Sequence, residues 1–304
     1  MTFAKRILLF LAVNFLVVAV ISFLLYLFDL QPFLSRYHLN VPSLAIFCLI
    51  WGMGGAFISL GLSRIMAKWM MGVKLIDPNT RDQDSCQVLE MVYRLSKKAG
   101  LPSMPQVGIY SSPEVNAFAT GPTKNRALVA VSTGMLLRLK EHEIEAVIGH
   151  EVTHIANGDM VTMTLLQGIV NAFVMFLARL LGFVITRALA SRGDRDRSEI
   201  SPFAFQMIVF VLEICFMILG SMVVARFCRY REFRADAGGA RLAGRDKMIA
   251  ALEALQRLVS IKDDAKSQPA IQALKISSQG GFMRLFSTHP PLEERIARLQ
   301  KLRV

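Results

Sequence analysis

The sequence predicts a mainly helical membrane protein, in which four apolar helices accompany a cytoplasmic domain with a small β-sheet. Of its 304 residues, 53% are hydrophobic and 19% are charged, and the mean hydropathy is +0.43. Soluble domains contain about 25% charged residues. The composition therefore indicates that a large part of the chain lies in a membrane.

Two uncharged segments near the N-terminus are predicted to cross the membrane, at residues 7–28 and 41–62. A helix needs about 20 apolar residues to span the hydrocarbon core, and both segments are long enough. The first exceeds the apolar core of a secretory signal, and no A-x-A cleavage site follows it. We therefore expect it to be an uncleaved anchor.

Residues 160–185 and 202–225 form a second apolar pair, but each contains a charged residue, Arg179 in the first and Glu213 in the second. Charges within a membrane are rare and usually face a partner or a water-filled cavity. Two interpretations are open: Arg179 and Glu213 pair across a helix hairpin, or they lie near the path of a substrate. Three arrangements of these helices are also open: they cross the bilayer fully, they line a chamber, or they enter the bilayer without crossing it.

Basic residues near the spans predict the orientation of the chain, because cytoplasmic loops carry an excess of lysine and arginine. The loop between the first two spans contains Arg36 alone, whereas five basic residues flank that pair: Lys5, Arg6, Arg64, Lys68 and Lys74. The N-terminus and the segment after residue 63 are therefore expected in the cytoplasm. An arginine-rich loop at residues 187–199 conflicts with this orientation if both later segments span.

Between the two apolar pairs, the pattern predicts two helices and three short strands. A helix at residues 82–99 ends at Gly100, and a second covers residues 141–156. The turn formers Gly121-Pro122 and Lys124-Asn125 separate the last two strands. The strands are expected at residues 107–110, 115–120 and 127–131.

After the second apolar pair, the pattern predicts mainly helices. One helix is expected at residues 245–259, and a final helix runs from Pro290-Pro291 to residue 302. The polar stretch between them, residues 262–281, is predicted to be mobile. No internal repeat is visible.

The helix at residues 141–156 contains the motif His150-Glu151-Val152-Thr153-His154, which has the form H-E-x-x-H. Residues four apart lie on one face of a helix, so both imidazoles can bind one zinc ion. Glu151, one step round the helix, can reach a water at the metal and act as general base. Because the chain has only five histidines, two of them at this spacing would rarely arise by chance. A surface-facing amphipathic helix is the alternative.

The third zinc ligand must come from further along the chain. A metzincin would continue with glycine and histidine where this chain has Asn157 and Met160, and no acidic residue occurs between Asp159 and Asp194. Of the later carboxylates, Glu232 is the best candidate because Asp236 follows it on the same helical face. One carboxylate would bind zinc and the other would accept the second ring proton of a ligand histidine. The alternative, a solvated salt-bridge face among arginines, is weakened by the upstream motif.

These features divide the chain into four parts. Residues 1–63 form the first transmembrane hairpin, and residues 160–225 form the second apolar pair. The intervening residues 64–159 carry the H-E-x-x-H helix, and residues 226–304 carry the third ligand. Both of the latter are predicted to be cytoplasmic parts of one zinc peptidase domain.

The net charge of +12 does not indicate a nucleic-acid partner, because no aromatic and basic recognition motif is present and the arginines lie beside the apolar segments. Membrane anchoring explains them better. The cysteines form no C-x-x-C pair, so no disulfide framework is expected, as suits a reducing compartment. They are Cys48, Cys86, Cys215 and Cys228.

Four motifs of this chain resemble those of the HtpX membrane metalloproteases, bacterial relatives of the CAAX prenyl endopeptidases. They cover nearly the whole chain in order and spacing: Asn116-Ala117-Phe118-Ala119-Thr120-Gly121, His150-Glu151-Val152-Thr153-His154, Glu232-Phe233-Arg234-Ala235-Asp236 and Thr288-His289-Pro290. The resemblance implies a mainly helical gluzincin fold with a small sheet.

The resemblance also implies a site and a role. One zinc ion per chain would be held by His150, His154 and Glu232, with Glu151 as general base and Asp236 behind the ligands. The enzyme would cleave misfolded or damaged membrane proteins at the bacterial inner membrane, facing the cytoplasm, in quality control and the stress response. Cooperation with other membrane proteases is part of that expectation.

Two further site assignments follow from family position. His289 is the candidate donor to the oxyanion of the reaction, and the alternative is a histidine that caps the helix after Pro290-Pro291. The strand residues Asn116, Ala117, Phe118 and Ala119 would bind substrate by edge addition, in which main-chain hydrogen bonds accept many sequences.

Two other functions are consistent with the motifs. The chain could be a zinc-bound scaffold or chaperone that holds unfolded membrane proteins without cutting them, although a complete motif with Glu151 argues against this. It could instead process one prenylated or signal peptide at a defined site, as the related eukaryotic enzymes do.

Overall fold

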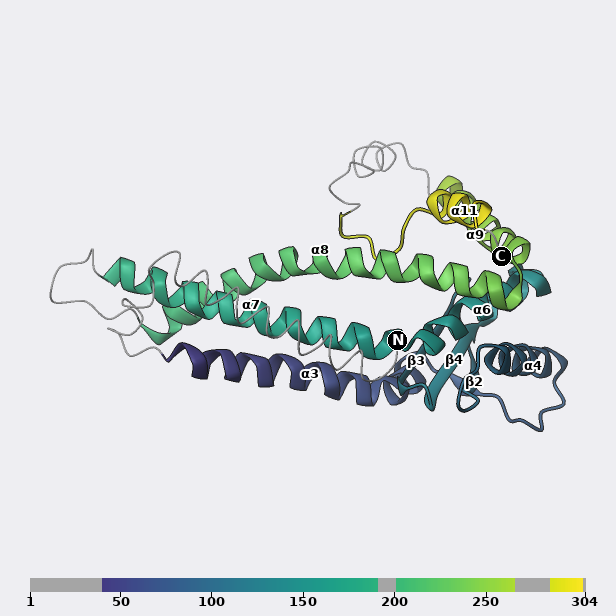
Figure 1. The fold of residues 1–304 in the computed structure, drawn as a ribbon, viewed down its shortest axis with the longest axis horizontal. Helices are drawn as coiled ribbons and strands as arrows, with labels where there is room; N and C mark the ends of the chain where they lie inside the picture. Colours follow the sequence, from purple (N-terminus) through teal and green to yellow (C-terminus); the bar gives the residue numbers. More distant parts are fainter. Residues whose placement is uncertain (1–39, 191–200, 266–284, 303–304) are drawn as a thin grey trace. The chain divides into compact units, whose positions relative to one another are not determined.

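The computed structural model describes residues 40–190, 201–265 and 285–302, and these divide into two compact units (Figure 1). Among the described residues, the first unit contains 40–58, 162–190 and 201–224, and the second contains 59–161, 225–265 and 285–302. The predicted span at residues 7–28 lies outside the described residues, as does most of the polar stretch at 262–281.

Three helices in the described part of the chain are long and apolar enough to cross a membrane: α3 (Val41–Met70), α7 (Asp159–Ala190) and α8 (Pro202–Ala243). They correspond to three of the four predicted apolar helices. Both α3 and α8 continue beyond the predicted apolar segments, because no proline interrupts them where polar residues begin. The α8 helix therefore runs from the apolar segment directly through Glu232.

Small residues allow the apolar helices of the first unit to approach closely (Figure 1). A methyl group on Gly52 of α3 would clash with the backbone of Ala172 on α7, and one on Gly182 would meet Val209 on α8. Arg179 Nη1 on α7 lies 2.7 Å from Glu213 Oε1 on α8. Of the two interpretations of these charges, pairing across the hairpin is thus observed.

The second unit contains a four-stranded mixed sheet in the order β1-β2-β4-β3. Strand β2 pairs parallel with β4, while β1 and β3 are antiparallel to their neighbours. The strands are β1 (Lys74–Leu75), β2 (Gln106–Tyr110), β3 (Ala117–Thr123) and β4 (Arg126–Ser132). Strand β1 was not predicted, because two residues are too few to show an alternating pattern.

Gly121-Pro122 lies within β3, so the prediction that it forms part of the turn is wrong. The pairing shifts between Thr120 and Thr123, and Gly121 has φ 142°, where a methyl group would clash with the backbone of Arg126 and Ala127. Only glycine readily adopts this backbone conformation. The strand therefore passes through an irregularity and turns only at Lys124-Asn125.

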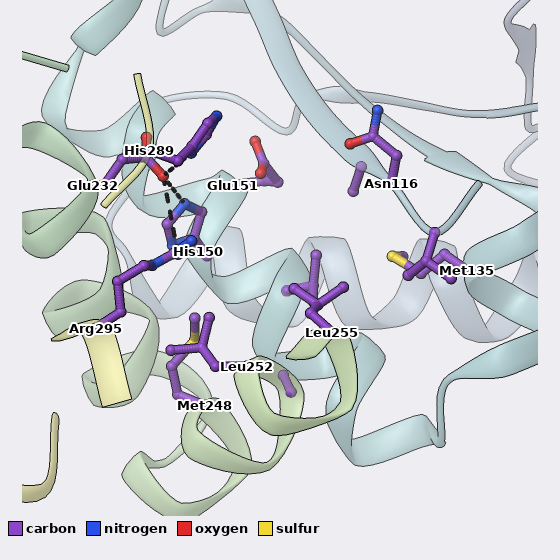
Figure 2. Close-up of a pocket in the computed structure, with 14 residues that line it drawn as sticks. Asn116, Met135, His150, Glu151, Glu232, Met248, Leu252, Leu255, His289 and Arg295 are labelled. Atoms are coloured by element: carbon purple, nitrogen blue, oxygen red, sulfur yellow. Dashed lines mark hydrogen bonds and ion pairs between the residues drawn. The ribbon is translucent and has the colours of Figure 1, made fainter. Parts of the chain in front are cut away.

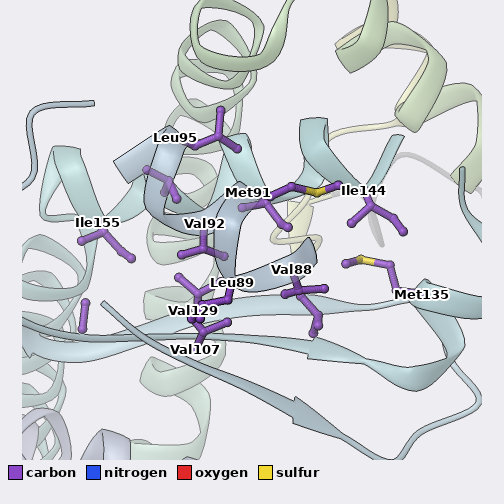
Figure 3. Close-up of a cluster of buried hydrophobic side chains, with 14 of the residues drawn as sticks. Val88, Leu89, Met91, Val92, Leu95, Val107, Val129, Met135, Ile144 and Ile155 are labelled. Carbon is purple, nitrogen blue, oxygen red and sulfur yellow. The ribbon is translucent and has the colours of Figure 1, made fainter. Parts of the chain in front are cut away.

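Both faces of the sheet are covered, with residues alternating between two cores, one of which is drawn in Figure 3. One face packs on α4 (Gln83–Lys98) and α6 (Glu141–Asn157) through Val107 and Val129. The other face buries Leu128 and Ala130 with Tyr110. Strand β4 is buried along nearly its whole length, which makes this sheet a rigid support for α6.

The remaining helices of the second unit are α5 (Thr133–Arg138), α9 (Arg245–Ala265) and α11 (Leu292–Gln300). The α9 helix extends beyond its predicted end into the start of the polar stretch, and α11 is slightly shorter than predicted. A third core joins α6, α9 and α11, with Met248 and Leu252 of α9 fully buried. Side chains of α9 line one side of the pocket described in the next subsection.

Candidate metal centre

The α6 helix places His150 and His154 one turn apart in the interior of the second unit. At its start, the backbone N–H of Lys140 donates to Glu143 Oε2 at 2.8 Å, and Gly158 ends the helix at φ 65°. The two histidine Nε2 atoms lie 3.1 Å apart. The predicted H-E-x-x-H helix is thus present with both rings on one face.

Close contact between α6 and α8 brings Glu232 to the histidines. The two helices cross at Gly238-Gly239, where a methyl group on Gly238 would clash with Thr153 and one on Gly239 would press on the His150 backbone. Thr153 is held by a 2.8 Å hydrogen bond from its hydroxyl to the Gly149 carbonyl. Because the backbones approach this closely, the Glu232 carboxylate can reach both rings.

His150, His154 and Glu232 form the one group of potential metal ligands found among the described residues. Glu232 Oε2 lies 3.4 Å from His150 Nε2, and Oε1 lies 3.4 Å from His154 Nε2. A tetrahedral ion with bonds of about 2.0–2.1 Å holds its ligand atoms about 3.3 Å apart. Two imidazoles and one carboxylate at these distances fit a catalytic metal site with an open fourth position.

Each ligand histidine has a carboxylate on its other ring nitrogen. His150 Nδ1 lies 3.0 Å from Asp236 Oδ1, and His154 Nδ1 lies 2.7 Å from Asp159 Oδ2. Such partners orient the ring and keep Nε2 free for the metal. The arrangement of Asp236 agrees with its predicted place behind the ligands, whereas Asp159 was not predicted.

Replacement of Asp159 with asparagine is expected to lower metal affinity by about 10- to 100-fold, the range typical of carboxylates behind metal-bound histidines. The amide keeps the size of the side chain but loses the charge that favours an Nδ1 proton on His154. Competition with a chelating dye measures the affinity. Asp246→Asn, an exposed carboxylate on α9, is the control. An affinity for Asp159→Asn within threefold of the control would contradict this role.

Charges buried around His150 set its protonation. Burial disfavours the charged ring, but Asp236 and Glu232 outweigh this and raise the pKa of His150 to about 9. A metal ion that binds at neutral pH therefore displaces a proton from this ring. Arg295 of α11 balances the negative charge through two bonds to Asp236, at 2.8 and 2.6 Å.

The segment before α11 passes directly over the ligands. His289 Nδ1 lies 3.0 Å from Glu232 Oε2, although the histidine side chain is 66% exposed. One turn before Glu232 on α8, Arg229 Nη1 donates to the carbonyls of Leu285 and Ser287 at 3.2 and 2.6 Å. The structure thus places His289 at the metal site.

A pocket of about 150 Å³ opens beside these residues (Figure 2). Glu151 lines it together with His150, Glu232 and His289, and Asn116 and Ala117 of the β3 region lie on one side. The α9 residues Met248, Leu252 and Leu255 line the other side. Phe118 instead packs against Tyr110, with ring centres 5.6 Å apart, and neither it nor Ala119 lines the pocket.

Sequence patterns did not identify Asp159, Arg295 or the Gly238-Gly239 pair. Asp159 follows directly after the glycine that ends α6, so its position one residue past the helix stop is a usable signal. The glycine pair sits inside a helical pattern, where glycine is unfavourable and indicates a close approach. Arg295 shows no local signal, because it is separated from Asp236 by 59 residues.

Comparison with known proteins agrees with this geometry. The pattern of peptidase family M48 matches residues 82–303. A Bacillus pumilus protein named "Protease HtpX homolog" is 48% identical over 304 residues, which cover 97% of this chain and 99% of the relative. This chain belongs to peptidase family M48. It is therefore a membrane metallopeptidase, as the sequence predicted.

Other relatives are consistent with this membership. Protease HtpX of Thioalkalivibrio sulfidiphilus is 48% identical over 300 residues, covering 98% of this chain and 99% of the relative. The crystal structure of S. mikatae Ste24p is 19% identical, with a TM-score of 0.56 over 93% of this chain. This chain corresponds to 63% of that protein's length, and the likeness shows a shared fold.

Proposed function

We propose that this M48 peptidase is a zinc endopeptidase of the bacterial inner membrane that cleaves misfolded or damaged membrane proteins on the cytoplasmic side. The observation that carries the proposal is the triangle of His150, His154 and Glu232, at zinc-like distances beside a pocket that Glu151 also lines. The basic residues that flank the apolar segments support the cytoplasmic orientation.

Zinc suits two imidazoles and one carboxylate, and when bound it polarises a substrate carbonyl and lowers the pKa of a water molecule. Glu151 does not belong to the ligand triangle, so its carboxylate is available to take the proton of the attacking water. The same group then delivers that proton to the leaving amine. Apolar side chains of α9 line the pocket beside this group.

His289 is proposed to stabilise the oxyanion that forms on the substrate carbonyl. Its Nδ1 faces Glu232, which leaves Nε2 as the nitrogen that can turn toward the substrate. Donation from Nε2 while Nδ1–H binds Glu232 requires the doubly protonated ring.

Strand β3 is proposed to bind the substrate backbone. It lies at the edge of the sheet, and on its paired side Ser132 N donates to the Asn116 carbonyl at 2.9 Å. Because backbone groups alternate along a strand, Phe118 also faces β4, whereas the N–H and C=O groups of Ala117 and Ala119 face the free edge. An extended substrate would therefore pair with these two alanines.

Ala119→Pro is expected to lower kcat/KM by roughly tenfold, because it removes one free-edge donor worth about 1 kcal/mol or more. Metal content and thermal stability should stay close to those of the unmodified protein. The matched variant Phe118→Pro removes a donor that faces β4 and should lower stability as well as cleavage. Unchanged cleavage by Ala119→Pro would contradict edge addition.

Restoration of activity by zinc tests the proposed function. Detergent-purified protein would be stripped of metal, supplied with zinc, and given an unfolded model protein as substrate. We expect zinc to restore cleavage at many sites, as quality control requires. Cleavage restored at a single site, or of a prenylated peptide alone, would instead indicate a processing peptidase. Zinc binding without any cleavage would contradict the assignment.

A further inference from the structure

Beyond its apolar segment, α8 has two opposite faces: one contacts other parts of the protein, and the other is exposed. Arg229, Glu232 and Asp236 lie on one face, and each contacts the segment that leads into or forms α11. This face therefore belongs to the metal site and contacts other parts of the protein.

The opposite face of α8 carries exposed basic and aromatic side chains. At 100° per residue, Arg226, Tyr230 and Arg234 lie about 120–200° around the helix from Glu232. Tyr230 is 60% exposed, and both arginines are exposed as well. Neither arginine has an ion pair or hydrogen bond with any residue that the structure describes, in contrast to Arg229 and Arg231.

This basic face continues an exposed apolar face of the same helix. Leu219 and Val223 lie in line with Tyr230, and they are 53% and 58% exposed in the last part of the apolar segment. Arg226 follows Val223 by about 4.5 Å of helix and Arg234 by about 16 Å. The headgroup layer begins where the apolar segment ends and is about 5–8 Å thick, and arginine side chains can reach back into it.

The end of α3 repeats this pattern independently. Its apolar segment is followed by Arg64 and Lys68, and then by Trp69, which is 82% exposed. Tryptophan, tyrosine and arginine are enriched at the membrane–water interface because each has an apolar body and a polar end. Two helices of this chain thus end their apolar segments with interfacial residues.

We propose that the face of α8 formed by Arg226, Tyr230 and Arg234 binds the anionic headgroups of phospholipids. The two guanidinium groups match lipid phosphate in charge and hydrogen-bonding geometry. Tyr230 lies between them in the helical order, and lipid on this face would contact its ring with acyl chains and its hydroxyl with headgroups. Lipid bound on this face would contact the side of α8 opposite to the side that carries Glu232.

The test uses full-length protein reconstituted in vesicles of phosphatidylcholine and phosphatidylglycerol in equal amounts. Electron paramagnetic resonance of spin-labelled lipids measures how strongly each lipid associates with the protein. The double variant Arg226→Gln/Arg234→Gln is compared with Arg126→Gln/Arg138→Gln, which removes the same charge from exposed positions of the second unit. The readout does not depend on cleavage, so it is independent of the proposed function.

We expect the unmodified protein and the control to prefer phosphatidylglycerol, with the preference decreasing at high salt. Each arginine near an anionic surface contributes roughly a fivefold preference, so the α8 double variant should lose most of it. Equal preference in the α8 variant and the control would overturn the proposal. Displacement of the labelled lipid by inorganic phosphate would also overturn it, because it would indicate a site for a free anion.

Discussion

Glu151→Gln is expected to lower kcat by about 100- to 10,000-fold, the contribution typical of a positioned general acid–base group. Glutamine keeps the size of the side chain but cannot take a proton from the attacking water. Glu151 lines the pocket next to His150 and lies outside the ligand triangle, so zinc binding should be nearly unchanged. Cleavage of an unfolded protein under single-turnover conditions, with metal content measured on the same sample, gives both quantities.

Glu141→Gln is the matched control, because Glu141 is exposed in the first turn of the same helix. It should retain full activity, which would show that loss of one carboxylate from α6 is not sufficient. A Glu151→Gln enzyme with activity within tenfold of the unmodified protein would remove Glu151 from the mechanism. A variant that loses both zinc and activity would instead indicate that Glu151 supports the ligand geometry.

Glu232→Gln is expected to weaken zinc binding by more than 100-fold and to abolish cleavage at ordinary zinc concentrations. The residue is 1% exposed and supplies the only negative charge of the three proposed ligands. Its carboxylate also attracts His289 and the guanidinium groups of Arg231 and Arg295. An amide would leave the two guanidinium groups near a site that then has to accept a dication.

Asp236→Asn provides a graded comparison for this prediction. Asp236 lies behind His150 on the same helix, so the affinity should fall by only about 10- to 100-fold. Isothermal titration with zinc measures both variants, and circular dichroism checks that each is folded. If Glu232→Gln binds zinc as tightly as Asp236→Asn, Glu232 is not a direct ligand and the third ligand lies elsewhere.

Local sequence patterns were sufficient to predict much of the fold. Asp82 and Gly100 flank the two ends of α4 as predicted, and Gly158 ends α6 in the left-handed conformation. Hydrophobic segments of about 20 residues identified all three apolar helices in the described part of the chain. These signals act within one or two helical turns, so they can be read without knowledge of distant contacts. Strand β1 and the path through Gly121 could not be predicted, because pairing with neighbouring strands determines both.

The sequence determined which metal-binding groups share a helical face, and tertiary structure determined how the helices that carry them meet. His150 and His154 share a face because the helical repeat requires it, and the spacing of Glu232 and Asp236 follows the same rule. The crossing at Gly238-Gly239, the bond from Arg295 to Asp236 and the place of His289 over Glu232 depend on the packing of helices far apart in the chain. Helical periodicity determines which side chains share a face, but only close packing determines which faces meet.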